Sequence, residues 1–351
     1  MNDGGDEMTQ HFLLNAEARN LSLKKVFRLS DQEAWELFRD IRWADNDGNP
    51  ECPHCGNDEK HYFIKTRSIW QCADCRKQFG ILTKTVFAHR QLPLQDYLAA
   101  IAIYSNGAKG VSMLQLSRDL DVQYKTAFVL AHKIRESIYK IEKENEAEEK
   151  LDGQVEVDGA YFLNKVRPAN VKADRIDRRL ARHQKASKSC VFTIRQRGEG
   201  KHAATKTRTF VIKTEEMGAV DALIRRAVES HAHITADSAK AYDNLTSYMA
   251  SVARVNHTVN YVDPETGAST NQAESFFSRM RRGYLGQHHR MSVKYLPEYA
   301  AEFGFREDTR RMANGDIFAE VVGRVSSNRG GESSNWVGYW QGRKKAEVVL
   351  V

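Results

Sequence analysis

The sequence predicts an α/β protein in which a mixed-sheet domain follows a zinc ribbon and a helical region. Three observations predict this architecture. Two Cys-x-x-Cys pairs lie near the N-terminus, helical periodicity runs from Leu94 to about Lys140, and the apolar residues alternate after residue 150. We expect a helical lead-in, a ribbon, a helix-turn-helix-like region with a linker, a mixed-sheet domain and a tail, over residues 1–50, 51–92, 93–150, 151–310 and 311–351.

The composition is that of a globular protein with excess positive charge. Hydrophobic residues make up 41% of the 351, which is too many for a globally disordered chain. Lys and Arg number 53 against 46 Asp and Glu, and the net charge of +7 favours a polyanionic partner. The longest apolar run, Tyr97–Tyr104, is far shorter than the ~20 residues of a membrane helix, and the acidic N-terminus does not resemble a signal peptide. We expect no association with a membrane.

The ribbon is predicted from four cysteines with the spacing of a zinc site, namely Cys52, Cys55, Cys72 and Cys75. Each Cys-x-x-Cys turn brings two thiolates onto one metal, and two turns complete a closed tetrahedral set. A closed set is structural because no position is left for water. A redox pair or coincidence is the alternative, and His54 and His61 could compete as ligands. Without a secretion signal, these cysteines also favour a reduced compartment.

Residues 112–134 predict two helices joined by a tight turn. Ser112 is placed to cap the first helix, and Asp121 falls at the turn. The pattern is typical of a helix-turn-helix, whose second helix would present four residues to a major groove, namely Gln123, Tyr124, Lys125 and Thr126. An ordinary helical hairpin is the alternative. Residues 140–150 are expected to form a charged helical tail or linker.

The alternating region predicts a mixed sheet. The expected elements are strands over Val155–Tyr161, Cys190–Ile194 and Arg208–Ile212, a helix over Met217–Ser230, and a strand over His231–Ala236. Between the first two strands, Lys165–Lys188 holds nine basic and two acidic residues. We expect this segment to be a mobile insertion that contacts phosphate through Arg175, Arg178, Arg179 and Arg182. A solvated loop is the alternative.

Three acids follow the predicted strands and helices in a pattern that suits a two-magnesium site. Asp158 is expected to close the first strand, and Asp237 to close the strand ending at Ala236, with a helix beginning at Ser238. Glu274 lies on a strongly amphipathic helix over residues 270–282. Carboxylates held together at buried strand ends are costly unless a cation neutralises them. Each acid alone would more often be a surface residue or a cap, but together they predict magnesium ligands.

Several motifs carry a resemblance to a known family. They lie at residues 155–162, 167–170, 177–180, 255–257, 270–278 and 286–289. They resemble bacterial insertion-sequence transposases with an N-terminal zinc ribbon, the ISXO-like group related to eukaryotic Merlin elements. The order of elements is similar to the ribonuclease-H-like integrase core of DDE transposases, whose second and third acids are typically separated as Asp237 and Glu274 are here. The sequence departs from the family at Leu163-Asn164, often Gly-Gly, and at Ser238, often an acid.

The resemblance implies a ribonuclease-H-like domain that binds transposon ends and performs metal-dependent DNA cleavage and strand transfer. Asp158, Asp237 and Glu274 would be the catalytic ligands of Mg²⁺ or Mn²⁺, while zinc would be structural. Because the family is divided between asparagine and glutamate at the third position, Asn271 is a further candidate catalytic residue; Glu274 is preferred because an anion binds magnesium better than an amide. The partners would be double-stranded end and target DNA and further copies of the chain on that DNA. The expected location is the bacterial cytoplasm, at the nucleoid.

Other residues have subordinate predicted roles. Arg281 and Arg282 should contact the DNA backbone, and His288 or His289 is a further candidate for such a contact. His257 would either orient a phosphate or stabilise the fold, and Glu156 is a candidate auxiliary acid. Two alternative functions remain open, a non-catalytic DNA-binding regulator and a nuclease that cleaves without joining. Residues 311–351 have no predicted function.

Overall fold

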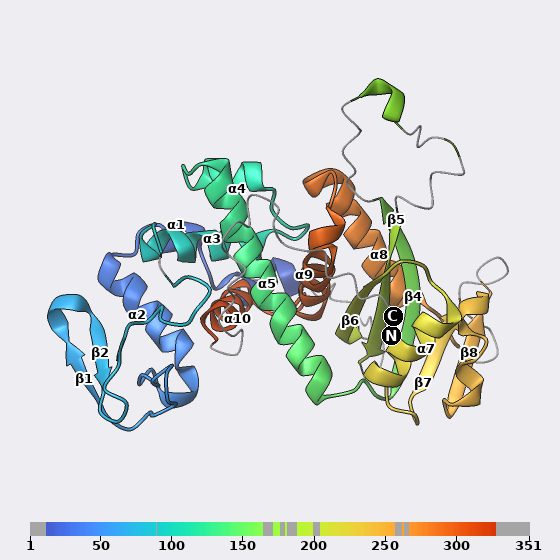
Figure 1. Ribbon diagram of the computed structural model, residues 1–351, viewed down its shortest axis with the longest axis horizontal. Coiled ribbons are helices and arrows are strands. Elements are labelled where there is room, and N and C mark those ends of the chain that lie inside the picture. Colours follow the sequence, from blue (N-terminus) through green and yellow to red (C-terminus); the bar gives the residue numbers. More distant parts are fainter. Residues whose placement is uncertain are drawn as a thin grey trace, which may run out of the picture. The chain divides into compact units, whose positions relative to one another are not determined.

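The computed structural model describes residues 12–88, 90–163, 171–175, 180, 188–198, 204–256, 262 and 267–327 (Figure 1). These residues form two compact units. The first takes its described residues from 1–108, 116–122 and 309–333, and the second takes them from 109–115 and 123–308. Within these described ranges, no helix has the length and apolar character needed to cross a membrane.

The first unit combines helices with a small antiparallel sheet in the order β1-β2-β3. Its elements are η1 (Phe12–Leu14), η2 (Glu17–Arg19), α1 (Leu23–Val26), α2 (Asp31–Arg42), η3 (Ala44–Asn46), β1 (His61–Ile64), η4 (Lys65–Arg67), β2 (Ile69–Cys72), β3 (Gln78–Phe79), α3 (Leu94–Asn106) and α10 (Asn314–Ser326). Helix α2 begins at a capping box in which Ser30 and Glu33 each accept the other's backbone N–H. Helices α1 and α2 lie in the segment that the sequence predicts to be a helical lead-in.

Helix α10 lies within the predicted C-terminal tail. It packs against α2 and α3, and it buries Phe318, Val321, Val322 and Val325. These apolar side chains recur at helical spacing, which explains why this stretch forms a packed helix. Residues 328–351 lie outside the described part of the chain.

The two helices of the predicted helix-turn-helix are present as α4 (Met113–Asp119) and α5 (Tyr124–Glu148). The Ser112 hydroxyl accepts the N–H of Gln115, as expected of a cap. Asp121, with a φ of 50°, occupies the left-handed conformation at the turn. Gln123, Tyr124 and Lys125 are exposed at the start of α5. The charged residues from 140 onward continue α5 to Glu148.

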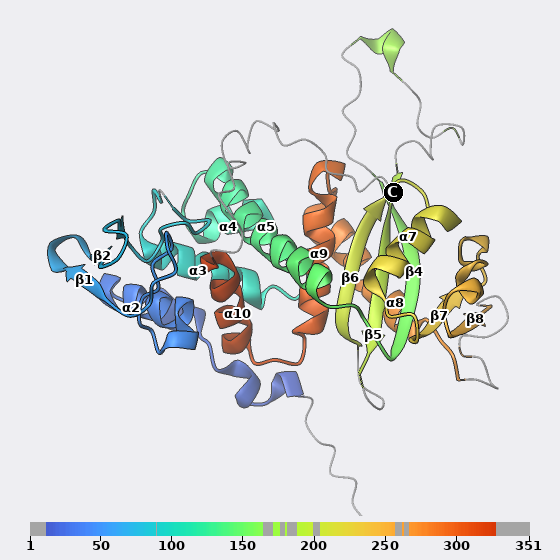
Figure 2. The ribbon, with the colours of Figure 1, turned by 60° about the horizontal axis from the view of Figure 1, so that its bottom comes forward.

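The second unit is built on a five-stranded sheet in the order β6-β5-β4-β7-β8 (Figure 2). The strands are β4 (Gln154–Leu163), β5 (Lys188–Arg197), β6 (Ala204–Ile212), β7 (His233–Asp237) and β8 (Ser251–Val255). Strands β4, β5 and β6 are antiparallel, whereas β7 is parallel to both β4 and β8. The sheet is therefore mixed, as predicted. Strand β8 was not predicted.

Helices cover both faces of this sheet. They are α7 (Met217–Ala227), α8 (Asn271–Gly283) and α9 (Leu296–Asp308). The unit also contains the short turns η5 (Lys172–Asp174), η7 (Lys240–Tyr242), η8 (Leu245–Ser247), η9 (Tyr284–His288) and η10 (Val293–Tyr295). Val155 and Val157 belong to a core that includes α7. Ala160 and Phe162 belong to a second core with α8 and α9. Because side chains alternate along a strand, the Asp158 side chain lies on the face of the sheet that α8 covers.

Two local expectations around the acids are wrong. Asp158 does not close its strand, because β4 continues to Leu163 and pairs with β5 over its whole second half. Asp237 is followed by two isolated 3-10 turns, η7 and η8, rather than by a helix beginning at Ser238. The physical reason for the first difference is that pairing with β5 satisfies the β4 backbone beyond the polar residue, a long-range contact that alternation cannot reveal.

Candidate functional site

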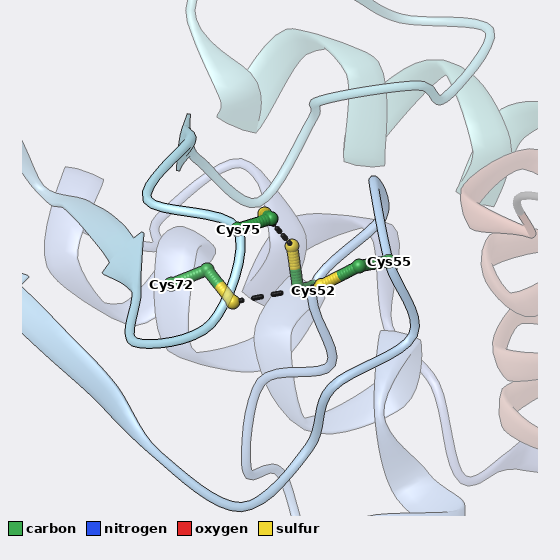
Figure 3. A group of neighbouring side chains, drawn as sticks. All are labelled: Cys52, Cys55, Cys72 and Cys75. Carbon is green, nitrogen blue, oxygen red and sulfur yellow. Dashed lines mark hydrogen bonds between the residues drawn. The ribbon is translucent and has the colours of Figure 1, made fainter.

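The four predicted zinc ligands come together in the first unit (Figure 3). Their sulfur atoms all lie within 4.8 Å of one another. The Cys52 and Cys75 sulfurs are 3.6 Å apart, as are those of Cys55 and Cys72. Thiolates around a tetrahedral zinc with bonds of ~2.3 Å are roughly 3.8 Å apart. The donor type and the spacing both fit a structural zinc, and neither His54 nor His61 joins the set.

Two similar turns position the cysteines. The N–H of Cys52 donates to the carbonyl of Asn57, and the N–H of Cys72 donates to the carbonyl of Lys77. In each turn the residue after the second cysteine has a positive φ, 76° at Gly56 and 60° at Arg76. Glycine adopts that conformation without strain, which explains its place in the first turn. The local sequence therefore determines the site's geometry.

Replacing Cys52 by serine should remove zinc from the protein, because three thiolates leave the tetrahedral set open and the ribbon has little core to hold it together without metal. Zinc measured per chain by atomic emission should fall from about one to near zero, with loss of binding to DNA ends. The second unit should stay folded. Cys190→Ser is the matched control, since Cys190 is buried in β5 and should leave the zinc content unchanged. Retention of zinc by Cys52→Ser would disprove the four-cysteine assignment.

The second unit brings the predicted aspartates together through strand register. Gln154, Val155 and Glu156 of β4 pair with His233, Ile234 and Thr235 of β7. Continuing this parallel register by two residues places Asp158 beside Asp237. Strand β7 ends at Asp237 whereas β4 continues to Leu163, so the two side chains lie where β4 extends beyond the C-terminal end of β7.

The electrostatics of Asp158 show which other acids lie near it. Burial is the main cause that raises the pKa of Asp158 to about 7, and the negative charges of Glu215, Asp237 and Glu274 raise it further. The N–H of Gly159 donates to the Asp158 carboxylate at 2.8 Å and acts in the opposite direction. Of these four acids, Asp158, Asp237 and Glu274 were predicted from the sequence, and Glu215 was not. Together they form an anionic cluster that a divalent cation would stabilise.

The cluster is open. Within the described ranges, the four cysteines are the only group of three or more His, Cys, Asp or Glu side chains that lies close enough together to hold a metal ion, and the carboxylates do not form such a group. Repulsion between like charges favours a wider spacing of the carboxylates. The carboxylate oxygens are nonetheless the donor type that Mg²⁺ and Mn²⁺ prefer.

A buried ion pair fixes the helix that carries Glu274. Glu156 is fully buried, and its carboxylate accepts the N–H groups of Gln272 at 2.7 Å and Ala273 at 3.0 Å, at the N-terminus of α8. Its other oxygen pairs with Arg197 at 2.5 Å, and Arg197 also donates to Ser269. A carboxylate at this end of a helix satisfies N–H groups that have no partner within the helix and complements its dipole. Glu156 therefore positions α8, and Asn271 is exposed at its first turn.

Glu215 and Tyr242 are members of the cluster that sequence reasoning missed. Glu215 lies between β6 and α7, and its carboxylate accepts a hydrogen bond from the Tyr242 hydroxyl. In the sequence, Glu215-Glu216 reads as ordinary acidic residues preceding a helix. Gly159, immediately after Asp158, is the one local signal in the sequence that another group approaches the β4 backbone closely at this point.

The predicted DNA contacts are only partly placed. Arg175, Lys125, Arg281 and Arg282 are exposed, whereas Arg178, Arg179, Arg182 and His257 lie outside the described residues. His289 is exposed. His288 does not suit a phosphate contact, because its ring packs on Tyr299 and burial lowers its pKa to about 3. A neutral, enclosed imidazole offers no charge to a phosphate.

Comparison with known proteins identifies the class. Residues 29–78 match the transposase zinc-ribbon domain, and residues 150–308 match the ISXO2-like transposase domain. An uncharacterized protein of the transposable element ISH50 in Halobacterium salinarum is 25% identical over 312 residues, covering 84% of this chain and 96% of that protein. No solved structure shows significant similarity.

These domains define a transposase. More particularly, the chain belongs to the insertion-sequence transposases that combine an N-terminal zinc ribbon with an ISXO2-like transposase domain. The first domain match includes α2 as well as the cysteines, and the second includes the sheet and all four clustered acids.

Proposed function

We propose that this protein is a DDE-type transposase that cleaves and joins DNA at transposon ends, with Asp158, Asp237 and Glu274 as its metal-binding acids. The observation that carries the proposal is the parallel register that sets Asp158 beside Asp237, with Glu274 near enough to raise the pKa of Asp158. The strand order and directions also support a ribonuclease-H-like fold for this unit. The match to a transposase zinc-ribbon domain supports binding to end DNA.

The roles of the chain's residues follow from the geometry. Asp158, Asp237 and Glu274 would hold paired Mg²⁺ or Mn²⁺ ions, which when bound activate the attacking oxygen and stabilise the leaving oxygen. Glu156 holds the N-terminus of α8 and would thereby keep Glu274 near Asp158. Arg281 and Arg282 lie exposed near the other end of the same helix, where they can contact the DNA backbone. The exposed start of α5, including Lys125, is a second candidate contact of a helix-turn-helix. Assembly of several copies on DNA is part of the proposal.

The test of this function is a reaction with DNA that carries the element's own ends. We expect magnesium-dependent nicked and joined products from the zinc-loaded protein. Asp158→Asn and Asp237→Asn should give neither product while still binding the ends, because an amide cannot replace a carboxylate's charge at the metal. Asp152→Asn is the matched control, since Asp152 is exposed and pairs with exposed His231.

The same reaction separates the alternatives. Cleaved DNA without joined product, across a range of target DNAs, would indicate a nuclease. Binding without cleavage in the unaltered protein would indicate a regulator. Equal cleavage by the protein and by both aspartate variants would contradict the proposed site.

A further inference from the structure

A fourth carboxylate, Glu215, is built against the strand that carries Asp158. A Cβ atom added at Gly159 would lie 2.5 Å from Cδ and from Oε2 of Glu215, and 2.8 Å from Oε1. No real side chain tolerates such contacts without a shift of the neighbouring group. Gly159 therefore provides the space in which the Glu215 carboxylate rests on β4, directly after Asp158.

Two hydrogen bonds hold Glu215 in that position. The Tyr242 hydroxyl donates to its Oε1, and Tyr242 is fully buried in the turn that follows Asp237. The backbone N–H of Glu215 donates to the Tyr161 hydroxyl at 3.0 Å. Glu215 is thus tied to β4, the strand that carries Asp158, through its backbone N–H. Its carboxylate is tied to the segment that follows Asp237 at the end of β7.

The Glu215 carboxylate also lacks a cationic partner. In the part of the chain that the structure describes, no Lys, Arg or His forms an ion pair with it. The negative charge of Asp237 raises the pKa of Glu215, and the negative charge of Glu215 raises that of Asp158, so the three carboxylates lie near one another. A half-buried anion beside other anions is costly unless a cation offsets it. By contrast, buried Glu156 pairs with Arg197 and caps a helix, so its charge is already compensated.

The position of Glu215 against β4 lets its carboxylate reach the C-terminal end of β7, where the predicted ligands lie. Because side chains alternate along β4, Gly159 faces the side of the sheet that α7 covers, whereas Asp158 faces the side that α8 covers. Strand β7 ends at Asp237, so among the described residues no strand pairs with this side of β4 beyond that point. Groups from both faces can therefore approach one ion at the strand edge.

We propose that Glu215 is a fourth metal-facing carboxylate of this site, held by Gly159 and Tyr242 so that it binds the divalent cation together with Asp158 and Asp237. This inference rests on the proposed function, since it concerns the same metal. It assigns to Glu215 a direct role at the metal, distinct from a purely structural role as the hydrogen-bond acceptor of Tyr242.

Mn²⁺ binding to the full-length, zinc-loaded protein without DNA tests this role, measured by electron paramagnetic resonance of free Mn²⁺. Glu215→Gln keeps the size and the oxygen acceptor for Tyr242 but removes the charge, so we expect Mn²⁺ affinity to fall at least ~10-fold. Glu216→Gln is the matched control, because Glu216 is the exposed neighbour, and its affinity should be unchanged. Tyr242→Phe removes the hydrogen bond that holds the carboxylate but keeps its charge, so the affinity should fall by less than it does in Glu215→Gln. Should Glu215→Gln fail to fold, Glu215→Asp, which keeps the charge but shortens the side chain, should also weaken binding.

The outcomes separate this inference from the function on which it rests. Asp158→Asn serves as the reference for a lost metal ligand. If it abolishes Mn²⁺ binding while Glu215→Gln, or Glu215→Asp in its place, binds as tightly as the unaltered protein, Glu215 is structural and the inference is overturned. If Asp158→Asn itself binds Mn²⁺ normally, the proposed metal site is overturned together with the inference.

Discussion

Glu274→Gln should abolish magnesium-dependent cleavage of end DNA while leaving end binding intact or slightly stronger. Glutamine keeps the size and helix propensity of the residue but removes the charge that would offset a magnesium ion. Helix α8 should remain in place because Glu156 holds its N-terminus. The measurement is strand cleavage on labelled end DNA, with binding measured separately by electrophoretic mobility shift.

Asn271→Ala is the comparison that decides the third catalytic position. Asn271 lies on the same helix but is exposed at its first residue. If it supports the site from outside the ligand set, its loss should slow cleavage by ~10- to 100-fold without abolishing it. The assignment of Glu274 would be wrong if Asn271→Ala were as inactive as Asp158→Asn while Glu274→Gln retained substantial cleavage.

The second large expected effect concerns the stability of the second unit rather than catalysis. Arg135 of α5 and Glu302 of α9 form an ion pair at 2.5 Å, with both side chains fully buried. Glu302 also pairs with Arg306 at 2.8 Å. Helix α9 packs on β6, so the pair links α5 to the helix that covers the sheet. Glu302→Gln leaves the Arg135 charge buried with less compensation and should lower the free energy of unfolding by about 3–5 kcal/mol, measured by urea denaturation.

The pH dependence of this effect has a definite sign. Burial alone would raise the pKa of Glu302, but Arg135 and Arg306 lower it from 4.5 to about 2. A carboxylate with a lowered pKa stabilises the folded state above its unfolded pKa, and that stabilisation is lost as the pH falls through the folded value. The difference in stability between the unaltered protein and Glu302→Gln should therefore be full above pH 4.5 and shrink as the pH falls toward 2.

Glu149→Gln is the control for this prediction. Glu149 pairs with Lys206 at 2.5 Å, but both side chains are well exposed. Exposed pairs contribute at most about 1 kcal/mol, so this variant should be close to the unaltered protein at every pH. A loss for Glu302→Gln no larger than that for Glu149→Gln would show that the buried pair does not stabilise this unit.

Much of the site could be predicted where the determining signal is local in the sequence. The cysteine spacing alone predicted the cluster, because two turns of fixed geometry place each pair of thiolates. The strand-like pattern of apolar residues predicted the central parts of β4, β5, β6 and β7, although helices bury both faces of the sheet. The amphipathic pattern predicted α8 and placed Glu274 on it. The acids themselves were recognised from these elements and from the family resemblance.

What the tertiary structure decided depends on contacts between residues distant along the chain. The extension of β4 past Asp158 follows from its pairing with β5, and the pairing of Asp158 with Asp237 follows from a register that no local pattern specifies. Glu156 caps α8 only because the fold brings β4 to the N-terminus of that helix. Glu215 joins the acids only because the turn before α7 rests on Gly159. Spacing and periodicity report short-range geometry, whereas burial, ion pairing and the approach of one charge to another are fixed only when the sheet and its helices pack together.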